Sequence, residues 1–202
     1  MSVVKDEDGY IVISRYESES LKNLNHPRKQ RAVAKITSNF FGTEFNCFET
    51  DLPVNSKHKY KVDTNTCPQL CTIEYETNFF GLTGPRKMTA FLPEEGQSFT
   101  PRKKLNEIYG KNPKGIEKFR NKCPKWCDDI EAYVLNFHGR ATISSVKNFI
   151  MIRENEDEES YPRVLFGKFG KELFNLDVRH PFSLVQAVAL AISSFDRKLA
   201  CE

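Results

Sequence analysis

Two pairs of cysteines are the first groups in this sequence whose types and spacing could do chemistry. Cys67 and Cys71 form one C-x3-C pair, and Cys123 and Cys127 form another. Four thiolates are a common ligand set for structural zinc, but this spacing is looser than the usual C-x2-C arrangement. We therefore expect neither a metal nor another cofactor, and we interpret the six cysteines as free thiols in a reducing compartment.

A histidine is the second candidate for catalysis. His138 lies in Asn136-Phe-His-Gly-Arg140, where it could serve as the base for a cysteine nucleophile. Such catalysis needs a nucleophile and a base arranged as a pair, and no such pair is visible in the sequence. We expect His138 to lie near the core with its hydrogen bonds satisfied, and we expect the protein not to be an enzyme.

Positive charge gathers in two parts of a chain whose net charge is only +3. Arg28, Lys29, Arg31 and Lys35 crowd one segment, and residues 102–125 carry nine lysines or arginines against two glutamates. An anionic partner and a plain solvated face are both compatible with such clusters. Nucleic acid is the less favoured partner, because regularly spaced stacking aromatics and a recognition-helix motif are lacking.

The elements that must position these residues read mainly as strands. Short apolar or alternating runs recur with turn signals between them, and no helical pattern separates successive runs as a βαβ fold would require. We predict a mainly β chain with a buried helix, of the α+β class, built on an antiparallel sheet, sandwich or barrel. The predicted strands are residues 10–14, 33–36, 72–75, 88–92, 133–137, 149–152, 164–169 and 173–178.

Two segments are predicted to be helical. Residues 182–195, FSLVQAVALAISSF, are apolar except for one narrow polar sector, and Pro181 suits the first turn of a helix. Such a helix rises about 21 Å, short of the roughly 30 Å hydrocarbon core, so protein rather than lipid must enclose it. Residues 105–122 are predicted to form one or two short surface helices, because Gly110 and Pro113 interrupt the pattern.

The length of the chain indicates one domain, and its first residues indicate a short polar tail. A chain of 202 residues without a linker or repeat fits a single core. Residues 1–8 are polar, lack the features of a signal peptide and are interpreted as a short tail before a domain over 9–202. No apolar run is long enough to span a bilayer. We expect a cytoplasmic protein, with the nucleus as the other compartment.

Several longer motifs resemble one known family. The chain is similar to the C-terminal domain of the tubby and tubby-like proteins over about residues 9–202. The motifs that carry the resemblance are Ser38-Asn39-Phe40-Phe41-Gly42-Thr43, Tyr75-Glu76-Thr77-Asn78, Gly84-Pro85-Arg86-Lys87-Met88, Tyr133-Val-Leu-Asn-Phe-His-Gly-Arg140, Ser145-Val-Lys-Asn-Phe149 and Ser193-Ser-Phe-Asp-Arg-Lys-Leu-Ala-Cys-Glu202.

The resemblance implies a closed twelve-stranded barrel threaded by a hydrophobic central helix. It also implies a non-enzymatic adaptor that binds plasma-membrane phosphoinositides, chiefly the 4,5-bisphosphate, as a peripheral protein at the plasma or ciliary membrane. Ciliary receptor trafficking and a proposed nuclear role belong to full-length members. The family domain begins several strands before this match begins, so we expect a barrel that is partial at its N-terminal end.

The family's headgroup site centres on a strand with lysine, one hydrophobic residue and arginine. Here that strand reads Lys35-Ile36-Thr37, and a further family arginine falls at Cys67. Only the lysine is retained, so lipid binding depends on new basic neighbours, for which Arg28, Lys29 and Arg31 are the candidates. The alternatives are a protein-binding adaptor with a decayed lipid site and a nuclear nucleic-acid-binding or transcription-linked factor.

Overall fold

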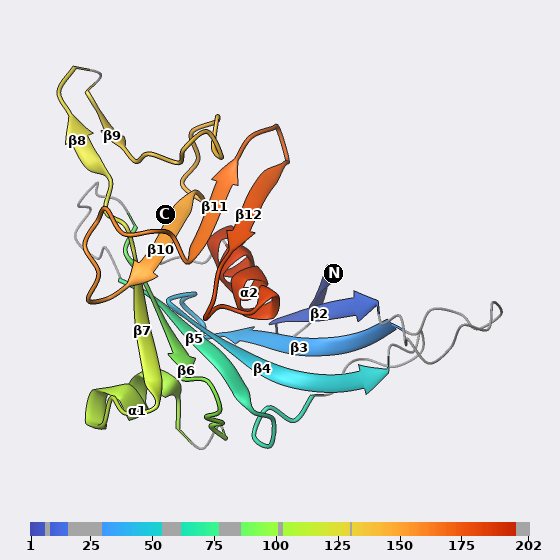
Figure 1. The fold of residues 1–202 in the computed structure, drawn as a ribbon. Helices are drawn as coiled ribbons and strands as arrows, with labels where there is room; N and C mark the ends of the chain where they lie inside the picture. Colours follow the sequence, from blue (N-terminus) through green and yellow to red (C-terminus); the bar gives the residue numbers. More distant parts are fainter. Residues whose placement is uncertain are drawn as a thin grey trace.

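One curved antiparallel sheet forms most of the molecule (Figure 1). The computed structural model describes residues 1–6, 9–15, 30–53, 62–76, 86–100, 103–129 and 131–196. The sheet order is β1-β2-β3-β4-β5-β6-β7-β10-β11-β12, and a separate hairpin pairs β8 with β9. The strands are β1 Ser2–Asp6, β2 Gly9–Arg15, β3 Gln30–Ser38, β4 Glu44–Pro53, β5 Gln69–Tyr75, β6 Met88–Pro93, β7 Ile116–Asn121, β8 Lys125–Cys127, β9 Ala132–Val134, β10 Phe149–Arg153, β11 Val164–Lys168 and β12 Phe174–Val178; the helices are α1 Leu105–Lys111 and α2 Leu184–Phe195.

All eight predicted strands are confirmed, although β9 is shorter than predicted. Three further main-sheet strands were missed. Strand β4 was missed because an irregularity interrupts its alternation of apolar and polar residues: the register with β5 shifts between Cys47 and Phe48. Ser2–Asp6, within the expected polar tail, forms β1 and pairs with β2. Ile116–Asn121, predicted to be helical, is strand β7, because it lies between β6 and β10 and hydrogen-bonds to both.

Helix α2 begins two residues after the predicted start. Ser183 caps it: the Ser183 hydroxyl accepts from the Gln186 amide, and the Ser183 amide donates to the Gln186 side chain. This reciprocal pair satisfies two amides at the helix start. Helix α1 is confirmed as a short helix beside β6. Its first residue, Leu105, is buried against the main sheet.

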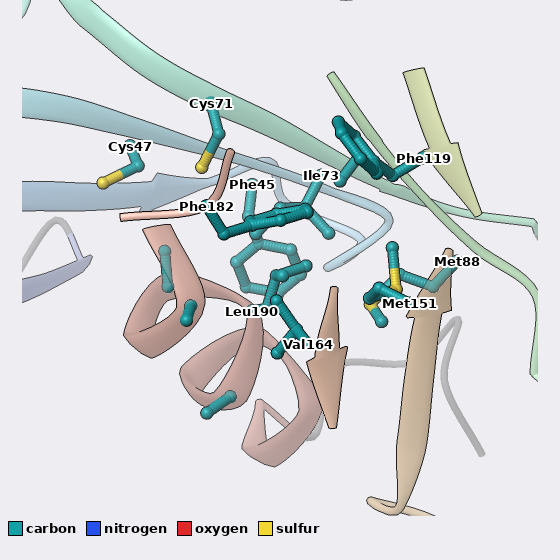
Figure 2. Packing of buried hydrophobic residues seen from close by; sticks show 14 of the residues in the cluster. Phe45, Cys47, Cys71, Ile73, Met88, Phe119, Met151, Val164, Phe182 and Leu190 are labelled. Atoms are coloured by element: carbon teal, nitrogen blue, oxygen red, sulfur yellow. The ribbon is translucent and has the colours of Figure 1, made fainter. Parts of the chain in front are cut away.

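Helix α2 lies in the hollow of the curved sheet, between β12 and the strands β3, β4 and β5. Figure 2 shows side chains from several strands pointing toward it, including Phe45, Ile73 and Val164 around Leu190. The polar sector of the helix faces the sheet. Gln186 donates to the Leu70 carbonyl at 2.8 Å, and the Ser193 and Tyr75 hydroxyls lie 2.9 Å apart.

The opposite face of α2 is less covered than predicted. Leu184 and Phe195 are exposed, and Val185, Val188 and Ile192 are only partly buried. The described part of the sheet does not close either, since its order starts at β1 and ends at β12 without pairing them. The helix is therefore enclosed only in part, and the described residues do not form the closed barrel that the resemblance implies.

We predict that Leu190→Ala destabilises the fold by about 2–5 kcal/mol, because this fully buried side chain fills the space between α2 and the sheet. Leu184→Ala, an identical change at an exposed position of the same helix, should cost less than about 1 kcal/mol. Urea unfolding followed by circular dichroism measures both. Equal losses would contradict the assigned orientation of α2.

Candidate anion-binding site on strand β3

Lys35 lies on the outer face of the sheet. Its neighbours Ala34 and Ile36 both enter the core cluster that contains α2. Lys35 is paired in register with Ile11 of β2 and Phe48 of β4, and its outer neighbours include the small cluster of Ile11, Ile13 and Ala32. The side chain is only 4% exposed. A cation this deeply buried requires an anionic or hydrogen-bonding partner.

Asp6 supplies an anionic partner. Its Oδ2 lies 3.8 Å from Lys35 Nζ, and its side chain is 19% exposed. Gly9 lets the β1–β2 connection approach β3 closely, since a Cβ there would lie 2.0 Å from the Ile36 carbonyl oxygen. Sequence reasoning missed Asp6, because residues 1–8 read as a polar tail. The two consecutive valines of Ser2–Asp6 were the signal for a strand.

Thr37 stands where the family carries an arginine. It is half-buried and paired in register with Asn46, which is paired with Thr72. The Gln69 amide donates to both Asn46 Oδ1 and Thr72 Oγ1 at 2.7 Å. The outer face beside Lys35 therefore carries a buried hydrogen-bond network at the position of Thr37 rather than a second cation, and this network ends at the Glu44 carboxylate, to which Asn46 Nδ2 donates at 2.8 Å.

Of the three proposed basic neighbours of Lys35, Arg31 is the one within the described residues, and it does not lie beside Lys35. Arg31 lies four positions earlier on β3, about 13 Å away along the strand. Its guanidinium is bound by the Asp51 carboxylate, and Arg31 Nη2 also donates to the Asp51 carbonyl at 2.9 Å. Arg28 and Lys29 lie outside the described residues.

Cys67, the other position at which the resemblance implies an arginine, also lacks positive charge. Cys67 is half-buried just before β5, next to Pro68, whose carbonyl accepts from the Glu49 amide at 2.8 Å. Tyr10 of β2 is paired with Ile36 and so faces α2 rather than Lys35. Burial, and then the charge and hydrogen bond of Asp196 at the end of α2, raise the pKa of Tyr10.

The cysteines do not assemble as the C-x3-C spacing would suggest. Cys71 instead lies opposite Cys47 in the β4–β5 register, and both are buried (Figure 2). The hydrogen bond with Cys71, followed by burial, raises the pKa of the Cys47 thiol well above its ordinary value. A thiol held protonated is a poor nucleophile and metal ligand. Within the described ranges no group of three or more His, Cys, Asp or Glu side chains is placed to hold a metal ion; Cys201 lies outside them.

His138 differs from its prediction. It is exposed rather than near the core, in a turn where its φ is +49° and its amide donates to Asn136 Oδ1 at 2.8 Å. A histidine tolerates this left-handed conformation better than most residues. Its sequence neighbour Arg140 makes two bonds to Asp177 of β12, at 2.6 and 2.7 Å, which tie this loop to the sheet.

Part of the positive charge in the basic stretch 102–125 is paired with carboxylates within the molecule. The acidic loop 154–159 lies beside β7, where Lys118 Nζ is 3.0 Å from Glu154 and Arg120 bonds Glu158. Lys104 lies 2.7 Å from Glu44 of β4. These pairs interrupt the positive charge of the stretch and so favour nucleic-acid binding less, although Lys103, Lys111 and Lys114 are exposed without an ion pair among the described residues.

Comparisons with known proteins identify the family to which the chain is similar. A model of the Tub family matches residues 7–197. The chain is 38% identical over 180 residues to Tubby-related protein 3 of Mus musculus, covering 84% of this chain and 38% of that protein. It is 40% identical over 178 residues to Protein king tubby of Drosophila grimshawi, covering 83% and 38%. The chain thus spans under two fifths of the length of these relatives.

Charge removal from the acidic loop tests the neutralisation. We predict that Glu154→Gln/Glu158→Gln creates salt-dependent binding to random duplex DNA, because it frees Lys118 and Arg120. Glu94→Gln/Glu172→Gln makes the same change in net charge at exposed positions elsewhere and should bind as weakly as the wild type. Fluorescence anisotropy at low and moderate salt measures this. Strong salt-dependent binding by the wild-type protein would contradict the interpretation.

Proposed function

The chain belongs to the Tub family, and from this membership we propose that it is a non-enzymatic, phosphoinositide-binding adaptor domain of the tubby type. It acts as a peripheral protein at the plasma or ciliary membrane, with a role in ciliary receptor trafficking. In the described residues, neither helix has the length and apolar character needed to cross a bilayer. The retained Lys35 on the outer face of β3 is the observation that carries the proposal.

A headgroup phosphate would replace Asp6 as the partner of Lys35. The two charges are 3.8 Å apart, longer than a strong charge-assisted hydrogen bond of about 2.7–2.9 Å. A doubly charged phosphate can approach the ammonium more closely and offers more acceptor oxygens. Asp6 then competes with the lipid, and movement of the N-terminal strand β1 opens the site.

A protein-binding adaptor is the second candidate. It draws support from Thr37 and Cys67, which carry no charge where the family has arginine. The uncovered side of α2, with Leu184 and Phe195 exposed, also gives such an adaptor an apolar surface.

Sedimentation with vesicles containing the 4,5-bisphosphate lipid tests the lipid proposal. Lys35→Ala should weaken binding about 10- to 100-fold, the value of one charge-assisted hydrogen bond. Asp6→Asn should strengthen binding, because it removes the competing carboxylate. Thr37→Arg should also strengthen it, because residues two apart on a strand share a face.

Lys171→Ala removes one positive charge at an exposed turn between β11 and β12 and serves as the matched control. It should bind like the wild type. If the wild-type protein sediments with bisphosphate vesicles no better than with neutral ones, the lipid proposal is wrong and the protein-binding adaptor takes its place.

A further inference from the structure

Two adjacent aromatic side chains project from the turn that joins β3 to β4. Phe40 is 80% exposed and Phe41 is 54% exposed, although most large apolar side chains of the main sheet are buried. Their rings pack edge to face, with centroids 5.4 Å apart. Each phenylalanine carries roughly 150–250 Å² of surface that folding would ordinarily remove from water. This tip therefore leaves apolar surface in water without any gain to the core.

The turn that carries them is firmly built. The Asn39 side chain donates to Thr43 Oγ1 at 2.7 Å and accepts from the Thr43 amide at 2.9 Å. The Asn39 and Gly42 backbones are bonded across the turn, and Gly42 supplies the positive φ of 70° that the reversal needs. The exposure of Phe40 and Phe41 follows from this turn geometry, which directs both side chains outward as a pair.

Charged side chains of both signs, Arg86 among them, lie at the same end of the sheet as the tip. The Thr43 carbonyl accepts from the Tyr75 amide at the end of β5, and the next residue, Glu76, donates its amide to the Lys87 carbonyl at 3.1 Å. Lys87 Nζ is paired with Glu76 at 3.0 Å, whereas the neighbouring Arg86 has no ion pair in the described part of the chain. In the described residues, this end of the sheet thus combines two apolar side chains with the Arg86 cation, the Lys87–Glu76 pair and the carboxylate of Glu74, which lies opposite Glu44 in the β4–β5 register and accepts from Asn106.

From this arrangement we infer that the Phe40–Phe41 tip is a membrane-contact element that inserts into the interface of an anionic lipid bilayer. Aromatic rings favour the boundary between headgroups and acyl chains, and a nearby arginine favours anionic lipid. A lipid surface fits better than a protein partner. Two side chains on a protruding turn offer far less than the roughly 800 Å² per partner of a stable protein interface, and a fluid bilayer needs no complementary groove.

A second exposed aromatic pair fits a bilayer less well. Trp126 and Tyr133 stack edge to face on the separate β8–β9 hairpin, with ring centroids 5.1 Å apart. The Trp126 ring nitrogen donates to Asp128 at 2.9 Å, and Asp129 next to it is also exposed. These carboxylates repel an anionic surface, so the Phe40–Phe41 tip is the better candidate.

The inference deepens the proposed function, because it names the surface that meets the membrane. Lys35 is on the same strand that leads into the turn, five residues before Phe40 and so about 16 Å away along the chain. A headgroup held at Lys35 and a tip held in the bilayer therefore use one hairpin. The two contacts are separable by experiment, since a soluble headgroup needs only the Lys35 site.

The test compares binding of Phe40→Ser/Phe41→Ser to phosphatidylserine vesicles with its binding to soluble inositol trisphosphate. We expect vesicle binding to fall at least about tenfold, because two partly inserted phenyl rings are lost. Binding of the soluble headgroup should stay at the wild-type level. Tyr161→Ser, which removes a 74% exposed aromatic ring elsewhere, should leave both unchanged.

The outcomes separate the two proposals. Wild-type-like vesicle binding by the tip variant overturns the membrane-contact inference, whatever happens at Lys35. Failure of the wild-type protein to bind soluble headgroup, combined with tip-dependent vesicle binding, overturns headgroup recognition and leaves the inference standing. Loss of both binding activities in the tip variant also overturns it, because the change would then act through the fold.

A fluorescent reporter gives an independent reading. The chain has one tryptophan, Trp126, so Phe40→Trp in a Trp126→Phe background places a single indole at the tip. Its emission should shift to shorter wavelength on adding phosphatidylserine vesicles, and lipids brominated on their acyl chains should quench it. An unshifted, unquenched indole on vesicle-bound protein would overturn the inference.

Discussion

The packing of α2 into the curve of the sheet is the constraint on which the rest of the structure depends. The sheet curves around this helix, and its strands send Phe45, Ile73 and Val164 into the same core. The polar sector of α2 is not left to solvent but is bonded inward, through Gln186 to Leu70 and through Ser193 to Tyr75. Buried hydrogen bonds of this kind fix one rotation of the helix, because any other would leave those groups unsatisfied.

The rotation of α2 determines which face of the sheet is covered by the helix and which face is available for binding. With the inner face committed to α2, the outer face of β3 is the side on which a charged residue can lie, and Lys35 lies there beside Asp6. The same rotation leaves Leu184 exposed at the open side, while the partly exposed Phe195 ring packs against Phe166 of β11 and Phe174 of β12. The proposed lipid site on the outer face of β3 and the apolar surface that could bind a protein partner are thus separate surfaces.

Much of the fold was readable from the sequence, and the errors have physical causes. The strands with regular alternation, such as residues 72–75, and the apolar segment of α2 were predicted correctly. Ile116–Asn121 was not, because its partners β6 and β10 are distant in sequence and pairing decided its conformation. For the site, the sequence identified Lys35 and the uncharged Thr37. It did not identify Asp6, whose relation to Lys35 exists only after β1 and β2 fold back onto β3.

The sequence by itself determined the mainly β class, a helix within residues 182–195 and the family, since these follow from local pattern and from motifs such as Ser38–Thr43. Only the tertiary structure decided which residues share a face. It paired the basic stretch with the acidic loop, put Cys47 opposite Cys71 and left Phe40 and Phe41 exposed at a turn. Charge and apolarity are properties of single residues, whereas neutralisation, burial and exposure depend on neighbours that folding brings from elsewhere in the chain.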